Sequence, residues 1–386
     1  MIRTEHWSNN YVIGIFFDLS KAFDTVNHSI LLFKLNSYGI RGSALQWFNS
    51  YLSNRSQFTV VNNHNSCLQP VTIGVPQGSI LGPLLFLIYI NDINRASNNA
   101  LLYLFADDSN AFISDSSLSL TFNKANRLCD ELSHWFKSNL LSVNYDKTAY
   151  ILFYPNSTDF TTISCNNLII SMDRNPINRI SHIKFLGIFI DENLNFKYHI
   201  TSLISKINSI RGMLYYRRDL IPFACRRNLY FALVHPHVQY CIEVYGLTFN
   251  YIIEPLRIAC NRILRTLQNA DRFSCVKTLY TNYDTLPPNL LCKVRMCRLV
   301  YKSIHLPSSL SVTTGNLLRR TQASHSYSTR TSHSNFLYKM SNKAFFNSYV
   351  NSYCSACNEI TRDIRNSVSL ILFMNKYKKF LIDNYW

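Results

Sequence analysis

The sequence predicts an α+β fold in its first half and a helical second half. Three observations lead to this prediction. Tyr11–Phe17 is an apolar, β-branched and aromatic run that indicates a buried strand. Leu101–Phe105 and Ser109–Ile113 flank an acidic tip and indicate a hairpin. Apolar residues recur at helical spacing from Leu118 to Asn139. Hydrophobic residues make up 47% of the 386 residues, so a sizeable core is expected and wholesale disorder is excluded.

The remaining elements follow from local patterns. Helical spacing predicts helices at Ser29–Tyr38, Ala44–Leu52 and Leu81–Ile93, and apolar runs predict strands at Phe58–Val61, Gln69–Ile73, Ala149–Phe153 and His182–Asp191. One apolar face of the helix from Leu118 is expected to hold Leu120, Ala125, Leu128, Leu132, Trp135 and Phe136. Beyond Phe196 the pattern is helical to about Leu286, Pro287-Pro288 indicates a break, and Leu370–Tyr385 predicts a basic amphipathic helix.

Charge is divided unevenly along the chain. The formal net charge is +17, and residues 1–195 hold 13 Lys/Arg against 14 Asp/Glu, which leaves 26 against 8 for residues 196–386. The second half is therefore expected to bind a polyanion, with a merely solvated basic face as the alternative. The start of the chain lacks an apolar signal region, and the most apolar stretch, Ile80–Ile90, is too short to span a bilayer. Together with eleven irregularly spaced cysteines, this predicts a protein of the nucleus or cytoplasm with no membrane partner.

Carboxylates follow two of the predicted strands. Asp18 comes directly after the first strand, and Asp107-Asp108 forms the hairpin tip. If these strands are neighbours, three carboxylates converge, at a cost of about 4 kcal/mol per pair at 4 Å and an effective dielectric near 20. A cation would offset that repulsion, and hard oxygen ligands suit Mg²⁺. Two such ions can activate a 3′-hydroxyl and stabilise a leaving pyrophosphate. Ordinary turn chemistry is the alternative for Asp107-Asp108.

Five segments occur in the order of a known polymerase family. They are Phe16–Val26 (motif A), Gly74–Leu84 (motif B), Phe105–Asp108 (motif C), Asn144–Thr148 (motif D) and Phe185–Gly187 (motif E). In these segments the chain resembles the reverse transcriptases of non-LTR (LINE-like) retrotransposons of the jockey and CR1-like kind. The resemblance implies a right-hand polymerase palm, an antiparallel sheet with packed helices, followed by a helical thumb and a basic C-terminal extension.

The resemblance also implies a role for each matching residue. Asp18, Asp107 and Asp108 would be catalytic ligands of two Mg²⁺ ions (Mn²⁺ as the alternative), with the Leu19 carbonyl as a further ligand. Lys147 would donate a proton to pyrophosphate, and Phe23 would be the steric gate beneath the deoxyribose. Pro76, Gln77 and Gly78 would line the dNTP and template pocket, and Phe185, Leu186 and Gly187 would form the primer grip. Asp24 is expected to be structural, as a helix-cap partner.

The implied organisation has three parts. Residues 1–195 would be the palm with partial fingers, 196–286 a helical thumb-like region, and 287–386 a basic C-terminal extension that is partly loop or disordered. The expected partners are an RNA template, a DNA primer and dNTP; the oligomeric state is not predicted. In the thumb, Arg211, Arg217, Arg218, Arg226, Arg227, Arg257, Arg262 and Arg265 alternate with Tyr215, Tyr216, Tyr230 and Phe231, either to clamp the duplex or with the rings turned inward.

Two hypotheses compete with an active polymerase. In the family, a longer fingers region precedes motif A than the residues before Phe16 provide, so an N-terminally truncated chain is expected. A catalytically dead nucleic-acid-binding remnant is therefore one alternative, and a group II intron or telomerase-like relative is the other. Separately, Cys292, Cys297, Cys354 and Cys357 have no standard zinc spacing, which leaves zinc binding beside free buried thiols.

Overall fold

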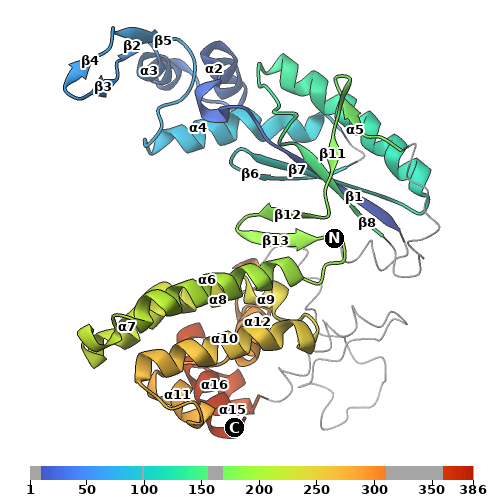
Figure 1. Ribbon diagram of the computed structural model, residues 1–386. Coiled ribbons are helices and arrows are strands. Elements are labelled where there is room, and N and C mark those ends of the chain that lie inside the picture. Colours follow the sequence, from blue (N-terminus) through green and yellow to red (C-terminus); the bar gives the residue numbers. More distant parts are fainter. Residues whose placement is uncertain (1–9, 98–99, 155–167, 310–359, 386) are drawn as a thin grey trace. The chain divides into compact units, whose positions relative to one another are not determined.

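The computed structural model describes residues 10–97, 100–154, 168–309 and 360–385. The chain divides into two compact units, Met1–Ser181 and His182–Trp386 (Figure 1). The boundary expected between residues 195 and 196 therefore lies inside the second unit. Within the described ranges, no helix is both long enough and apolar enough to cross a membrane.

A five-stranded sheet forms the centre of the first unit. Its strand order is β11-β8-β1-β7-β6, and all pairs are antiparallel except β11 with β8. The strands are β1 (Tyr11–Phe17), β6 (Leu101–Phe105), β7 (Asp108–Asp115), β8 (Ala149–Phe153) and β11 (Asn178–Arg179). Strand β1 is central and buried from Val12 to Phe17, which explains its uninterrupted apolar sequence. The predicted mixed fold with an antiparallel-rich sheet is confirmed.

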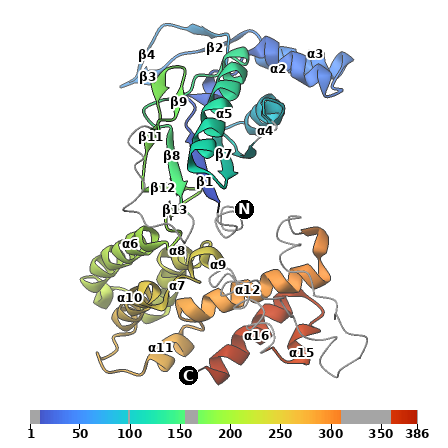
Figure 2. The ribbon, with the colours of Figure 1, turned by 90° about the vertical axis from the view of Figure 1, so that its right-hand side faces the viewer.

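Among the described residues of the first unit, four α-helices accompany this sheet. They are α2 (His28–Ser37), α3 (Gly42–Leu52), α4 (Leu81–Ile90) and α5 (Leu118–Ser138), with short 3₁₀ turns η1 (Ala22–Asp24) and η2 (Asn91–Arg95). Helices α4 and α5 share one hydrophobic core with the sheet (Figure 2). The buried face of α5 includes Ala125, Leu128 and Phe136. Leu120 was expected on that face but is 51% exposed, because it lies outside the i, i+3, i+4 series that these buried residues follow.

Two small hairpins lie between α3 and α4 in sequence. Strand β2 (Arg55–Gln57) pairs with β5 (Gln69–Val71), and β3 (Val60–Val61) pairs with β4 (His64–Asn65). The predicted continuous strand Phe58–Val61 is wrong in its first half, and the predicted Gln69–Ile73 strand ends early. The residues Asn62 and Asn63 both have positive φ, 48° and 64°, so they form the tight turn that joins β3 to β4.

The segment His182–Asp191 is a hairpin rather than the single strand expected from its sequence. Strands β12 (His182–Phe185) and β13 (Ile188–Asp191) are joined by Leu186 and Gly187. Both joining residues have positive φ, 44° and 84°, as a two-residue hairpin turn requires. A similar pair, β9 (Ser171–Met172) and β10 (Asn175–Pro176), completes the strands.

The rest of the second unit is helical and shares one hydrophobic core, in which α6 packs along α10 (Figure 1). Its described helices are α6 (Lys197–Tyr215), η4 (Arg218–Leu220), α7 (Phe223–Leu233), α8 (His235–Gln239), α9 (Ile242–Tyr245), α10 (Asn250–Gln268), α11 (Val276–Asn282), α12 (Pro288–His305), η5 (Pro307–Ser309), α15 (Arg362–Arg365) and α16 (Leu370–Asn384). The expected basic helix at the end is confirmed as α16. Its residues Phe373, Tyr377 and Leu381, spaced by four, are buried.

The predicted break at Pro287-Pro288 is the start of a helix. Pro288 occupies the first turn of α12, where a missing N–H costs nothing and the fixed φ suits the helix. Helices α12 and α16 contact each other and contribute to the same core as α6 and α10. The boundary expected after Leu286 therefore does not divide the core. Residues 310–359 of the extension that was expected to be partly loop or disordered lie outside the described residues.

Candidate functional site

Strands β1 and β7 are neighbours in the sheet (Figure 1), and acidic residues lie at the end of β1 and at the start of β7. The last paired residues of the two strands are Phe17 and Ser109, so the next positions across the ladder are Asp18 and Asp108. Burial raises the pKa of Asp108, and the negative charges of Asp107 and Asp18 raise it further. The three carboxylates therefore act on one another electrostatically, as the sequence leads us to expect if the strands are neighbours.

The turn between β6 and β7 presents two of these acids to solvent. Phe105 pairs with Asp108, which leaves Ala106 and Asp107 as the turn residues. Ala106 has φ 52°, a left-handed conformation that costs a non-glycine residue about 1 kcal/mol. Asp107 and Asp108 are exposed. Among the described residues, no three His, Cys, Asp or Glu side chains are arranged to hold a metal ion.

Residues 142–148 hold the backbone of Asp18 in place. The Asp18 N–H donates to Oγ1 of Thr148 at 3.3 Å, and its carbonyl accepts from the N–H of Asn144 at 2.8 Å. Leu19 forms an isolated bridge with Val143, and its side chain is buried in the core. Lys147 lies in the exposed turn of the same segment. The segments predicted as motifs A and D are therefore adjacent, joined through the main chain.

Phe23 lies beneath the loop that leads into α4. Its ring packs against the ring of Phe86, with centroids 4.6 Å apart and planes at 34°. Its carbonyl accepts a hydrogen bond from the N–H of Val75 at 2.8 Å. Phe23 is half-buried, whereas Phe86 is fully buried. The ring is thus fixed from one side by the helix that follows residues 74–80.

Asp24 is the partner of Gln77, not of a helix cap. Nε2 of Gln77 donates to Oδ1 of Asp24 at 2.7 Å, and Asn27 caps α2 instead. A second contact, which the sequence does not predict, joins these loops: Nε2 of His28 lies 2.7 Å from the Gly74 carbonyl oxygen. Pro76 is half-buried, while Gln77 and Gly78 are exposed. No short sequence pattern predicts a contact between two residues that lie some fifty positions apart.

Gly74 is required where the two loops approach most closely. It has φ +86°, and a Cβ there would lie 2.7 Å from the carbonyl oxygen of Asp24. Gly74→Ala is therefore expected to lower the free energy of unfolding by about 1–3 kcal/mol. Gly78→Ala is the matched control: φ is +79° but no atom lies within 4 Å, so only the backbone cost of about 1 kcal/mol applies. Urea unfolding measures both, and equal losses would contradict the close approach.

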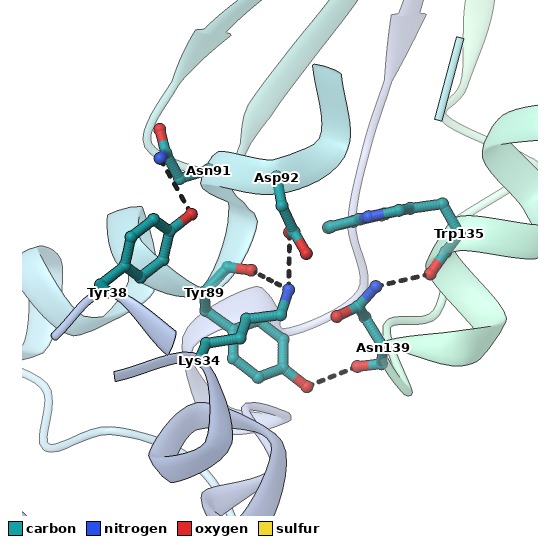
Figure 3. A network of polar contacts seen from close by, with 7 residues as sticks. All are labelled: Lys34, Tyr38, Tyr89, Asn91, Asp92, Trp135 and Asn139. Carbon is teal, nitrogen blue, oxygen red and sulfur yellow. Dashed lines mark hydrogen bonds and ion pairs between the residues drawn. The ribbon is translucent and has the colours of Figure 1, made fainter. Parts of the chain in front are cut away.

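A buried lysine on α2 contacts residues of α4, η2 and α5 in the first unit (Figure 3). Nζ of Lys34, on α2, donates to the Tyr89 carbonyl oxygen at 2.5 Å and to Oδ1 of Asp92 at 2.7 Å. It also lies 4.8 Å and 4.9 Å from the ring centroids of Tyr89 and Trp135. The Tyr89 hydroxyl donates to the Asn139 carbonyl at 2.5 Å. Burial lowers the pKa of Lys34, while its hydrogen bond to Asp92 opposes that shift.

The hairpin predicted as a primer grip belongs to the second unit. Phe185 ends β12, and Leu186 and Gly187 form the turn. The Tyr240 hydroxyl donates to the Leu186 carbonyl at 2.7 Å, and a Cβ on Gly187 would lie 3.2 Å from the Tyr240 ring. Tyr240 therefore supports the tip of the hairpin, a contact that the sequence analysis did not anticipate.

The basic and aromatic residues of the second unit separate into two groups. Tyr216 is 87% exposed, and Arg218 lies over the ring of Tyr215 at 4.4 Å. By contrast, Tyr230 is fully buried, and the Arg226 guanidinium is buried and donates to the Ile221 carbonyl at 3.0 Å. The inward-turned interpretation is therefore confirmed for Tyr230 and Arg226, while duplex binding by the exposed residues stays a prediction.

Two of the four cysteines considered for zinc lie in the described core. Cys292 and Cys297 are buried on α12, and Sγ of Cys292 donates to the Ile242 carbonyl at 3.4 Å. Burial raises the pKa of the Cys292 thiol to about 12, so it stays protonated. Cys354 and Cys357 lie outside the described residues.

Comparison with known proteins identifies the first unit. Residues 3–190 match the family model described as reverse transcriptase (RNA-dependent DNA polymerase). The RNA-directed DNA polymerase from mobile element jockey of Drosophila melanogaster is 25% identical over 273 residues, which cover 68% of this chain and 29% of that protein. The corresponding jockey protein of Drosophila funebris is 25% identical over 74% of this chain and 31% of its own length. The probable RNA-directed DNA polymerase from transposon BS of Drosophila melanogaster is 26% identical, with 71% and 31% covered.

Among solved structures, telomerase from Candida albicans in complex with a fragment of telomeric RNA matches with 12% identity and a TM-score of 0.34. The match covers 73% of this chain and 49% of that one. A similarity this low carries no argument. The chain spans less than a third of the length of the curated relatives named above.

The chain therefore carries a reverse transcriptase domain, of a family that generally uses divalent metal ions. It is homologous to the RNA-directed DNA polymerases of the non-LTR retrotransposons jockey, BS and X-element.

Proposed function

We propose that this chain is the RNA-directed DNA polymerase region of a non-LTR retrotransposon. It would extend a DNA primer with dNTPs along an RNA template. The observation that carries the proposal is the group formed by Asp18, Asp107 and Asp108 at one sheet edge of a reverse transcriptase domain. The relatives named as RNA-directed DNA polymerases support it.

The acidic group has the carboxylate chemistry of a divalent-cation site, although its three side chains do not form a metal-binding arrangement in the described residues. Carboxylate oxygens are the ligands that Mg²⁺ prefers, and mutual repulsion of the kind that raises the pKa of Asp108 is what a cation offsets. We assign Asp18, Asp107, Asp108 and the Leu19 carbonyl as ligands of two Mg²⁺ ions, with Mn²⁺ as the alternative. When bound, the ions would activate the primer 3′-hydroxyl and stabilise the charge of the leaving pyrophosphate. Lys147, in the adjacent exposed turn, would donate a proton to that pyrophosphate.

The paired loops around Phe23 and Gln77 would form the nucleotide pocket. The Asp24–Gln77 hydrogen bond fixes the loop that holds Pro76, Gln77 and Gly78 against the residues after β1. The exposed residues of that loop, Gln77 and Gly78, would contact the incoming nucleotide and its template base. The exposed Gly78, with φ +79°, would let the main chain approach a nucleotide closely.

Phe23→Val tests the pocket through sugar selectivity. Because the Phe86 ring holds Phe23 in place, a valine would leave room for a ribose 2′-hydroxyl. Incorporation of rNTP relative to dNTP is expected to rise on the order of tenfold or more. Phe86→Leu is the control, since it removes the supporting ring but keeps Phe23. If both variants merely lose stability and keep the wild-type ratio, Phe23 is a core residue and no gate.

The larger organisation follows the same proposal. The sheet and helices of the first unit would be the palm with partial fingers, and the helices from residue 196 the thumb. The residues beyond 287 would form the basic extension. Phe185, Leu186 and Gly187 would be the primer grip, supported by Tyr240. The exposed arginines and tyrosines near the end of α6 would contact the phosphates and sugars of the template–primer duplex.

Template-dependent synthesis on poly(rA)/oligo(dT) tests the proposal. The purified chain is expected to incorporate dTTP when Mg²⁺ is present and the template is RNA. Binding of the same duplex without incorporation would instead indicate a nucleic-acid-binding remnant, the second candidate function. That candidate is favoured by the strongly basic second half, which offers a binding surface whether or not the acids are catalytic.

A further inference from the structure

A stacked aromatic pair lies on a helix with a narrow buried face, formed by Leu52 and by the partly buried Leu45, Phe48 and Tyr51. Helix α3 has eleven residues, of which only Leu52 is buried. Trp47 and Tyr51, one helical turn apart, stack with ring centroids 5.6 Å apart and planes at 7°. The guanidinium of Arg55 lies 6.0 Å from the Tyr51 ring centroid, just after the helix ends. We call Trp47, Tyr51 and Arg55 the α3 platform.

Trp47 is the open ring of the platform, because Tyr51 is half-buried against the core of the first unit. Trp47 is 54% exposed, although it also contacts Phe48 edge to face at 5.1 Å. Because the Trp47 ring already has a fixed orientation, little conformational entropy of this side chain is lost when a second ring stacks on it. Burying it in the protein would have been the ordinary outcome for tryptophan.

The charge around the platform favours a polyanion. From Thr25 to Asn91 the sequence has no Asp or Glu, yet it contains Lys34, Arg41 and Arg55. Lys34 is buried and paired with Asp92, so the solvent-facing cations of this segment are Arg41 and Arg55. These two arginines would attract the phosphates of a nucleic acid, and no carboxylate within the segment would repel them.

Aromatic rings beside arginine are the chemistry that binds unpaired bases. A base can stack on a protein ring only if one of its faces is free. Bases of single-stranded RNA have such a free face, whereas bases inside a duplex do not. In RNA-templated synthesis the template ahead of the growing end is the strand that is still unpaired. The platform is also linked to the proposed pocket, because its Arg55 pairs with Val71 across the β2–β5 ladder and Gly74 follows three residues after Val71.

We propose that the α3 platform binds the single-stranded RNA template before it is copied, by stacking bases on Trp47 and Tyr51 while Arg55 holds phosphate. This inference rests on the proposed function for the identity of the strand. An apolar protein-docking surface is the competing explanation, because Phe58 and Val61 nearby in sequence are 52% and 62% exposed.

The test is binding of fluorescently labelled oligo(rU) by the full chain, without metal ion or dNTP. Trp47→Leu keeps apolar bulk but removes the ring face, so binding is expected to weaken roughly 5- to 100-fold. Arg55→Lys keeps the charge but loses the planar guanidinium and is expected to weaken binding less. Phe33→Leu, at a 70% exposed ring on α2, is the matched control and should bind as the wild type does.

Tryptophan fluorescence gives a second, direct measurement. The chain has four tryptophans, and stacking of a base on Trp47 is expected to quench part of their emission. That quenching should disappear in Trp47→Phe and should be weaker when oligo(rU) is replaced by duplex. Unchanged oligo(rU) binding by Trp47→Leu would overturn the inference. A change of oligomeric state in Trp47→Glu with unchanged RNA binding would establish protein docking instead.

Failure of the platform and failure of the polymerase proposal are distinguishable. The binding experiment needs no catalysis, so it succeeds or fails whether or not dTTP is incorporated. Conversely, the chain could be an active polymerase whose Trp47→Leu variant binds oligo(rU) normally. In that case the proposed function stands and only the α3 platform is rejected as a template-binding site.

Discussion

Asp108→Asn is expected to abolish primer extension on poly(rA)/oligo(dT) while leaving binding of the duplex intact. Asp108 faces Asp18 across the sheet and follows Asp107 in the turn, so it is the acid whose pKa both neighbours raise. An amide keeps the shape but removes the negative charge that would hold the metal ions. Because the same change relieves repulsion, we expect no loss of stability in urea unfolding.

Asp115→Asn is the control for that experiment. Asp115 lies at the opposite end of the same strand, where its carboxylate pairs with Lys124 at 2.7 Å. This substitution should leave primer extension unchanged, because it removes a partly exposed ion pair at the end of β7 opposite to the acidic group. Wild-type extension by the Asp108→Asn variant would overturn the assignment of the catalytic acids, as would equal loss in both variants.

Lys34→Met is expected to give the largest loss of stability among the variants considered. The lysine side chain is 9% exposed and its partner Asp92 is 29% exposed, so the change leaves a poorly hydrated carboxylate without its cation. Removing one partner of a buried pair costs 3–5 kcal/mol, and partial exposure of Asp92 reduces this to about 2–4 kcal/mol. Urea unfolding followed by tryptophan fluorescence measures the loss, with Trp135 beside the substituted residue.

Lys124→Met is the matched comparison. Its side chain is 48% exposed, so removing it from Asp115 should cost less than about 1 kcal/mol. If Lys34→Met unfolds at the same urea concentration as Lys124→Met, the Lys34 group contributes little to joining α2, η2 and α5. A loss confined to Lys34→Met would establish that the buried group is structural.

Local patterns were sufficient for much of the fold. The strand Tyr11–Phe17, the hairpin around Asp107 and the long helix from Leu118 each carry their periodicity within a few residues. The errors occurred where a single residue changes the path of the chain. At Leu186-Gly187 two positive φ angles turn one apparent strand into a hairpin, and at Pro288 a residue typical of breaks begins a helix.

The candidate site was predictable only in part, for a different reason. The order of the motifs directs attention to Asp18 and Asp107-Asp108, but their proximity depends on β1 pairing with β7, which is tertiary structure. The Asp24–Gln77 and Lys34–Asp92 pairs join residues more than fifty positions apart. Neither spacing has periodicity, so no local pattern reveals them. The roles of Lys147, Phe23 and the primer-grip residues remain predictions.

The contacts around Gly74 close a long excursion of the chain at its base. Asn27 bridges to Ile73, the Gly74 N–H donates to the Val26 carbonyl at 2.7 Å, and His28 reaches the Gly74 carbonyl. The chain between these residues, which includes α3 and the two small hairpins, therefore begins and ends at one place, where these contacts hold its two ends together. The length and shape of that excursion can therefore change while the separation of Phe23 from Gln77 stays fixed, so the proposed template-binding platform and the proposed nucleotide pocket can be altered separately by substitution.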